Sequence, residues 1–192
     1  MKVWAYLNSN GVLCCALNQS SVPAGVNATE LDVNSPDDVV YESGTIRPKT
    51  QAELLAAVQQ QALQQLSQST LSYISHYYPD WKQRSDISDL ANGEAYLTYA
   101  GINITQIRQI ITQQILSGAS YTQALSTLNQ TFNSNTNPTI GYWLEQLLKV
   151  GYRQDFVFKV KQQYYSISQQ LSSATALPLP SYTISVPPPN VP

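Results

Sequence analysis

Charged residues are what this sequence has least of. Asp, Glu, Lys and Arg make up 11% of its 192 residues, where about 25% is ordinary, and the formal net charge is −2. Affinity for nucleic acid comes mostly from Lys and Arg that neutralise phosphates. The densest basic group, Lys149, Arg153, Lys159 and Lys161, is interrupted by Asp155, which is typical of a solvated face. The sequence therefore predicts no nucleic-acid partner.

Residues that hold metals or perform catalysis are also scarce. The chain has one histidine, His76, and two adjacent cysteines, Cys14 and Cys15, which would point to opposite faces of a strand and are badly placed to bridge each other. We interpret them as two buried thiols acting as small hydrophobes. No glycine-rich phosphate loop occurs, and nothing selects partners for His76 in a Ser-His-Asp arrangement. The sequence predicts no metal site, no cofactor, no small-molecule substrate and no enzymatic activity.

Long apolar runs are missing as well. The longest early run, residues 12–17, is far shorter than the roughly 20 residues that a membrane-spanning helix needs. Residues 8–11, Asn-Ser-Asn-Gly, would split the hydrophobic region of a signal peptide. We therefore expect a chain that is neither membrane-bound nor secreted.

The acidic residues near the middle of the chain do not form a recognisable site. Asp80, Asp86, Asp89 and Glu94 lack the alternating ligands and the glycine of a calcium loop, and a hydrolytic pair of carboxylates cannot be inferred from sequence separation. Their spacing favours local ion pairs and helix caps. Asp86 or Ser88 is predicted to cap a short helix that ends near Asn92-Gly93.

Uncharged polar residues take the place of the missing charges, with 21 Gln and 21 Ser in the chain. A soluble monomer normally carries mixed surface charge. Two explanations stay open: much of the surface faces other protein subunits, or the composition has drifted in an unusual host.

Strand signals come first along the chain. Alternating apolar residues and turn dipeptides predict a four-stranded antiparallel meander over residues 1–49, supported by the helix that follows. Asn10-Gly11 is the expected hairpin turn. The predicted strands are residues 2–7, 12–17, 28–33 and 39–46, the last of which could also pair with itself across Ser43-Gly44.

A long helix over residues 50–78 organises the rest. Thr50 and Glu53 have the spacing of a capping box, and Pro79 marks the end of the helix. One face is expected to pack inward, and its residues are Leu55, Val58, Ala62, Leu66, Tyr73 and Tyr77.

Three further helices are predicted in the second half of the chain. The first follows an N-cap at Asn103 and closes at Gly118, and the second runs from Ser120 to Phe132. The third extends from Pro138 to about Ser172 with a break or bend at Gly151.

The last segment, residues 173–192, is rich in proline and is predicted to form an extended arm. Side chains able to anchor such an arm on another subunit are Leu177, Leu179, Tyr182, Ile184 and Val186. The fold class is therefore α+β: a small antiparallel β module (1–49), a mainly helical region (50–172) and an extended proline-rich arm (173–192).

Two segments resemble a known group of proteins. The opening MKVWAYLNSNGVLCCAL, with ATELDV and YESGTIRP, resembles the small N-terminal β module of tail and tail-fibre-associated proteins of tailed bacteriophages. YPDWKQ, residues 78–83, is similar to the Tyr-Pro-x-x-Lys-Gln segments that follow such modules. The resemblance covers residues 1–84.

The resemblance implies a non-enzymatic structural protein of the virion tail, made in the host cytoplasm. A tail-fibre, fibre-anchoring, baseplate or adaptor subunit would fit it. Together with the low charge, it predicts a homo-oligomer, a trimer or a ring, that also binds other tail proteins. The alternatives are a tail-fibre assembly chaperone that is absent from the mature particle and a tail-associated peptidoglycan hydrolase.

Overall fold

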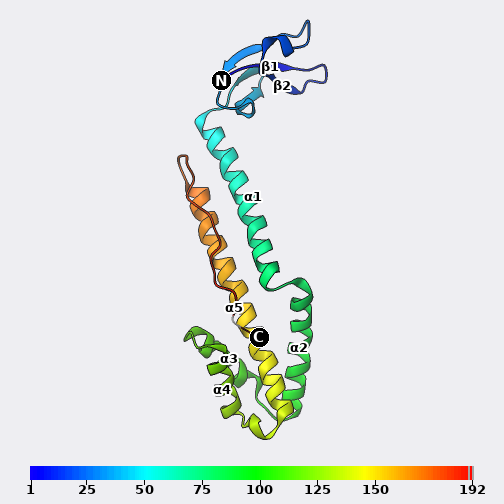
Figure 1. The fold of residues 1–192 in the computed structure, drawn as a ribbon, viewed down its shortest axis with the longest axis vertical. Coiled ribbons are helices and arrows are strands. Elements are labelled where there is room, and N and C mark those ends of the chain that lie inside the picture. Colours follow the sequence, from blue (N-terminus) through cyan, green and yellow to red (C-terminus); the bar gives the residue numbers. More distant parts are fainter. Residues whose placement is uncertain (190, 192) are drawn as a thin grey trace. The chain divides into compact units, whose positions relative to one another are not determined.

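The computed structural model describes residues 1–189 and 191, and its elements are drawn in Figure 1. The chain forms two compact units. Unit 1 comprises residues 1–62 and 174–179, and unit 2 comprises residues 63–173 and 180–192, of which residues 190 and 192 lie outside the described part. Antiparallel strands come first and five α-helices follow, which confirms the predicted α+β class.

The strands of unit 1 form two sheets. Strands β1 (Lys2–Leu7), β2 (Leu13–Ala16) and β3 (Thr29–Asp32) are antiparallel in the order β2-β1-β3, and β4 (Val39–Glu42) pairs with β5 (Thr45–Pro48). The predicted single meander is wrong in this respect. Val3 and Ala5 of β1 are fully buried, and β1 is hydrogen-bonded along both edges as the central strand.

The turns explain why these strands pair as they do. Between β1 and β2, the Asn8 side-chain oxygen accepts hydrogen bonds from the backbone N–H groups of Asn10 and Val12, and Gly11 has a φ of 72°. Ser43 and Gly44 both have positive φ, as a two-residue hairpin turn requires. Both predicted turn positions are confirmed, although the first loop is longer than two residues.

The core of unit 1 is small. It consists of Val3, Ala5, Val33 and Val39, with Leu13, Cys15, Leu31 and Ile46 packed around them. The two cysteines are half-buried free thiols, so the prediction that both are buried was too strong. Burial raises the pKa of the Cys15 thiol.

Helix α1 (Gln51–Tyr77) begins with the predicted capping box. The backbone N–H of Glu53 donates to the Thr50 hydroxyl oxygen at 3.3 Å, and the backbone N–H of Thr50 donates to a Glu53 carboxylate oxygen at 2.7 Å. Arg47 of β5 donates to both oxygens of Glu53 and also pairs with Glu42. The Arg47 guanidinium, followed by Thr50, lowers the pKa of Glu53 to about 2.

This pKa predicts a pH dependence. The folded pKa of Glu53 lies below the value of about 4.3 expected for the unfolded chain. Its stabilising effect should therefore be complete above about pH 5 and should be lost as the pH falls towards 2. Glu53→Gln should remove this part of the acid dependence of the melting temperature of unit 1. An unchanged acid dependence in the variant would contradict the assignment.

The unit boundary falls within α1, and the buried positions of the helix differ from the predicted stripe. Ala62 and Leu66 are buried as expected, but Thr70 and Ile74 continue the buried row in unit 2, while Tyr77 is exposed. The buried residues Ala62, Leu66, Thr70 and Ile74 are four positions apart. Because a helical turn takes about 3.6 residues, residues at this spacing lie on nearly the same face of the helix.

Helix α2 (Asp80–Tyr99) is longer than predicted and continues through Asn92-Gly93. Gly93 is buried, and a Cβ placed there would lie 2.6 Å from Leu147 Cδ1 and 2.9 Å from Trp143 Cε3. Glycine at this position allows α2 to approach the last helix closely. It does not end the helix.

The later helices start and stop largely as predicted. Asn103 caps α3 (Ile104–Leu116), and Ser120 caps α4 (Tyr121–Thr131) through a capping box with Gln123. Helix α5 (Pro138–Ser173) passes through Gly151 without a break. A Cβ at Gly151 would lie 2.7 Å from Ile111 Cγ2, so this glycine also makes room for a neighbouring helix.

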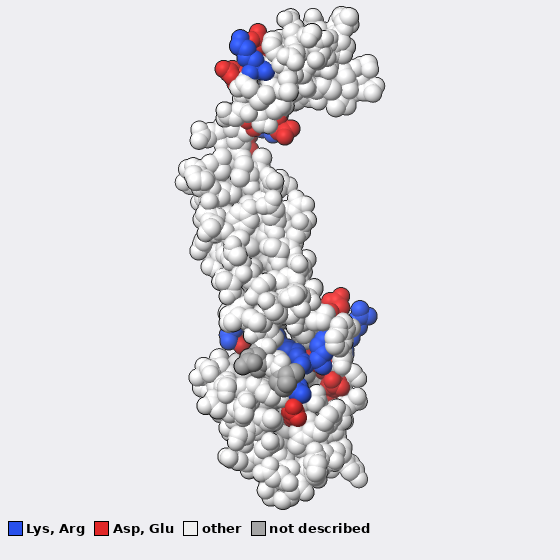
Figure 2. All heavy atoms as spheres, viewed as in Figure 1, with Lys and Arg blue, Asp and Glu red and all other residues white. Residues whose placement is uncertain are grey.

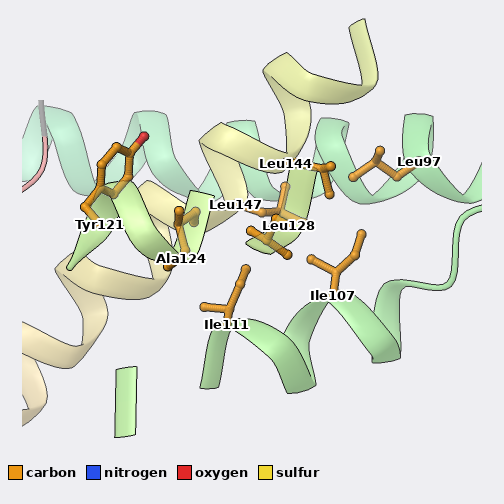
Figure 3. Close-up of a cluster of buried hydrophobic side chains, with 9 residues drawn as sticks. Leu97, Ile107, Ile111, Tyr121, Ala124, Leu128, Leu144 and Leu147 are labelled. Carbon is orange, nitrogen blue, oxygen red and sulfur yellow. The ribbon is translucent and has the colours of Figure 1, made fainter. Parts of the chain in front are cut away.

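The main core of unit 2 lies among α2, α3, α4 and α5, and most of it is drawn in Figure 3. Side chains from all four helices point towards one another there. The buried members are Leu97, Ile107, Ile111, Tyr121, Ala124, Leu128, Leu144, Leu147 and Leu148.

Candidate assembly site in the C-terminal arm

The structure places the five predicted arm residues in different surroundings. Ile184 is only 8% exposed, and Leu179, Tyr182 and Val186 are half-buried. Leu177 is exposed at 42%. The arm therefore uses part of its apolar surface within its own chain, and Ile184 is its best-buried anchor.

Side chains of unit 2 hold residues 182–186 of the arm. The amide of Gln163 on α5 makes two hydrogen bonds to Ser185: its Nε2 donates to the Ser185 hydroxyl at 3.1 Å, and its Oε1 accepts from the Ser185 backbone N–H at 2.9 Å. The Tyr73 hydroxyl on α1 donates to the Val186 carbonyl oxygen. The Tyr182 hydroxyl of the arm donates to Oε1 of Gln65 on α1 at 2.7 Å. We call the three residues that bind the arm, Gln65, Tyr73 and Gln163, the arm seat.

This mode of binding follows from the sequence of the arm. Prolines on both sides of residues 181–186 lack a backbone N–H and disfavour helix, so the segment stays extended with alternating side chains. Figure 1 shows the arm running beside α5. Because the arm joins no sheet, its backbone groups need partners from side chains, and Gln163 supplies a donor and an acceptor together.

The residues that directly follow α5 in the chain, 174–179, belong to unit 1. Gln59 of α1 donates to the carbonyl oxygen of Ala174 at 2.9 Å, and residues 175–178 are exposed. We call residues 174–179 the connector.

For residues 182–186 of the arm, the free energy gained from contacts is close to the entropy cost of ordering the segment. The four hydrogen bonds to residues 182–186 contribute about 1 kcal/mol each, and burial of Ile184 contributes about 2 kcal/mol. Ordering five residues costs about 5–10 kcal/mol, which these prolines reduce by pre-extending the chain. The arm is therefore held marginally.

Beyond residue 186 the arm packs incompletely. A cavity of about 350 Å³ lies between Pro187–Pro189 of the arm and side chains of unit 2 that include Tyr121, Tyr152 and Phe156. Val191 packs at the edge of the main core. The cavity lowers the stabilisation that this end of the arm obtains from its own chain.

The arm and its seat lie in an uncharged part of the sequence. Residues 54–79 and 162–192 contain no Asp, Glu, Lys or Arg. Figure 2 shows the visible charged side chains of unit 2 gathered in one zone, with the rest of its visible surface uncharged. Contacts between residues 182–186 and the arm-seat residues Gln65, Tyr73 and Gln163 involve no charged side chain, whereas Pro187–Pro189 lie beside Asp155 and Lys159.

A buried ion pair joins α2 to α5 inside unit 2. Asp86 is 2% exposed and Arg153 is 9% exposed. Nη1 of Arg153 lies 3.0 and 3.1 Å from the two carboxylate oxygens of Asp86, and Lys82 Nζ lies 2.9 Å from Oδ1. Tyr78 donates to Oδ2 at 2.9 Å, and burial, followed by this contact, raises the Tyr78 pKa.

Two predictions about charged residues are therefore wrong. Asp86 is not a helix cap, because it lies in the interior of α2 and binds a residue 67 positions away. Arg153 is not on a solvated face, although Lys149 and Lys159 pair locally with Glu145 and Asp155. Since Asp86 is closed off from solvent, a substrate has no access to it in this conformation.

The cavity lined by Glu94 does not bring two carboxylates together. Its volume is about 320 Å³, and it lies among α2, α3 and α5. Glu94 is the one carboxylate among its described lining residues, and it is paired with Arg108. A two-carboxylate hydrolytic mechanism therefore has no second group at this cavity.

The remaining chemical candidates stay isolated. The His76 ring is exposed and packs edge-on against Tyr77, with ring centroids 4.6 Å apart. Within residues 1–189 and 191, no three His, Cys, Asp or Glu side chains gather in a group that could hold a metal ion. The same described residues include no helix with the length and hydropathy to cross a membrane.

Comparison with known proteins gives no relative from which a function could be transferred. No family model, curated protein or solved structure matches the chain.

Sequence reasoning found the arm but missed the residues that hold it. Gln65 and Gln163 were not singled out, because nothing in the sequence distinguishes them from the other 19 glutamines. Tyr73 was predicted to face inward; it is half-buried and packs against Phe156, and its hydroxyl also donates to the arm, which the sequence did not indicate.

Proposed function

We propose that this protein is a non-enzymatic structural subunit of a tailed-phage virion that assembles through protein-protein contacts. A tail-fibre, fibre-anchoring, baseplate or adaptor subunit would use such contacts. The observation that carries the proposal is the arm: an uncharged, extended terminal segment that is marginally held on an uncharged seat. Terminal arms of this kind dock readily because a pre-extended chain loses little entropy on binding.

The β module supports the same proposal. Its two hairpins and its small core lie in a separate unit, and it contains the opening segments that resemble phage tail modules. We expect it to bind other tail proteins, while the helices and the arm connect copies of the chain in a trimer or a ring. This division of roles would explain why uncharged residues concentrate in residues 54–79 and 162–192.

Mass spectrometry of purified phage particles tests the proposal. We expect the protein in multiple copies per particle, as for a structural subunit. Presence in the infected-cell lysate together with absence from particles would contradict it and would favour an assembly chaperone.

Deletion of residues 174–192 tests the role of the arm in assembly. The truncated chain should retain its helical circular dichroism signal, because α1 to α5 end before the deletion, and its incorporation into particles should fall sharply. Leu116→Ser, at an exposed position outside the arm, is the control and should be incorporated normally. Loss of the helical signal on truncation would mean that the arm belongs to the core of its own chain.

A further inference from the structure

We propose that the arm seat on α1 and α5 is a receptor for the arm of a second copy, so that neighbouring copies exchange arms. This inference rests on the proposed function, because assembly is what brings copies of the chain next to one another. It names the partner that the arm and its seat would bind.

The seat recognises features that every copy carries. Gln163 and Tyr73 bind backbone atoms of Ser185 and Val186, and the one well-buried side chain is that of Ile184. The arm of another copy would make identical contacts. Exchange of identical elements therefore loses none of the interactions within the seat, which is why it is a low-cost route to oligomers.

The arm can leave without disturbing the helices. The connector, residues 174–179, separates it from α5, and residues 175–178 are exposed. The buried residues of the main core of unit 2 come from α2 to α5, and among the described arm residues Val191 packs at its edge. Rotation within the connector would redirect the arm, while the helices keep their packing.

The balance between the two arrangements depends on how close copies are. Within one isolated chain the connector favours the chain's own seat, because it keeps the arm nearby. In an assembly, neighbouring seats reach comparable effective concentrations, so the same contacts can form between copies as within one chain. The uncharged arm and seat also bring no like charges together when copies meet.

Photo-cross-linking can distinguish the arrangements. Tyr182 is replaced by p-benzoylphenylalanine, which keeps an aromatic ring next to Gln65. The full-length variant is mixed at high concentration with wild-type chain labelled with heavy nitrogen, incubated until exchange is complete, and irradiated. If arms exchange, we expect adducts of dimer mass or larger. In these adducts an arm peptide of the unlabelled (light) variant is joined to an α1 peptide of the labelled (heavy) wild-type chain that contains Gln65.

Two controls define the background. The same replacement at Tyr41, an exposed tyrosine of the β module, reports random collisions and should give about tenfold fewer heavy-light adducts with α1. Ile184→Asp, added to the Tyr182 variant, should abolish the arm-to-α1 adducts while the helical circular dichroism signal is retained.

Each of the other outcomes overturns the inference. Light-light adducts at monomer mass would show that each arm stays on its own chain. A lack of adducts with α1 would show that the arm does not use the seat in solution. Neither result would remove the protein from particles, so the particle composition still tests the proposed function separately.

Discussion

Replacing Asp86 with alanine is expected to lower the free energy of unfolding by about 3–5 kcal/mol, the usual effect of removing one partner of a buried ion pair. Arg153, 9% exposed, would lose a carboxylate that it contacts at 3.0 and 3.1 Å. Tyr78 would lose its acceptor as well. Urea denaturation followed by helical circular dichroism measures the change.

The matched control is Glu94→Ala, which lies in α2 like Asp86 and breaks the pair of Glu94 with Arg108 of α3. The Arg108 side chain is largely exposed, and exposed pairs contribute about 0–1 kcal/mol. The double variant Asp86→Leu with Arg153→Met should recover most of the loss, because apolar residues of similar volume can replace a buried pair. Equal effects of Asp86→Ala and Glu94→Ala would contradict this view of the network.

Leu128→Ala should produce a loss of about 2–5 kcal/mol, as cavity-forming substitutions in a packed core do. Leu128 of α4 is fully buried, and it belongs to the same core cluster as Ile111 of α3 and Leu144 of α5. The helices around it cannot close in freely, because Gly93 and Gly151 already hold their partners at close approach. The cavity should therefore remain largely open.

Leu116→Ala makes the same chemical change at a position that is 81% exposed. Its effect should stay within about 0.5 kcal/mol, as for surface substitutions in general. Similar losses for Leu128→Ala and Leu116→Ala in urea denaturation would mean that the described core does not form in solution.

The sequence predicted the features that depend on a few neighbouring residues. The cap of α1 needs only Thr50 and Glu53, and the starts of α3 and α4 need only Asn103 and Ser120 with their following turns. The hairpin at Ser43-Gly44 likewise follows from two residues that accept positive φ. Such signals act over three or four positions, so they are readable without knowledge of the fold.

The sequence failed where the meaning of a residue depends on a distant partner. Gly93 and Gly151 were predicted to interrupt helices, but each lies within a helix beneath a large side chain of another element. A glycine that ends a helix and one that allows close packing have the same local sequence signature. Asp86 and Arg153 are 67 positions apart, and no local pattern marks them as a pair.

Of the candidate site, the sequence predicted the arm but not the seat, because the seat also depends on residues that are distant in the chain. Proline content and alternating apolar residues identified the arm and its side chains. The seat is built from ordinary Gln and Tyr residues on two helices, and their importance arises only when the chain folds and places them beside the arm.

The four hydrogen bonds described for residues 182–186 of the arm join neutral partners: Gln, Tyr and Ser side chains and peptide groups. Dissolved ions weaken attraction between opposite charges by screening it, and they have no such effect on these contacts. The buried pair of Asp86 and Arg153 is likewise shielded from them. These contacts of residues 182–186 should therefore persist unchanged from dilute buffer to concentrated salt, and in the proposed assembly of copies they would make attachment through this segment insensitive to ionic strength.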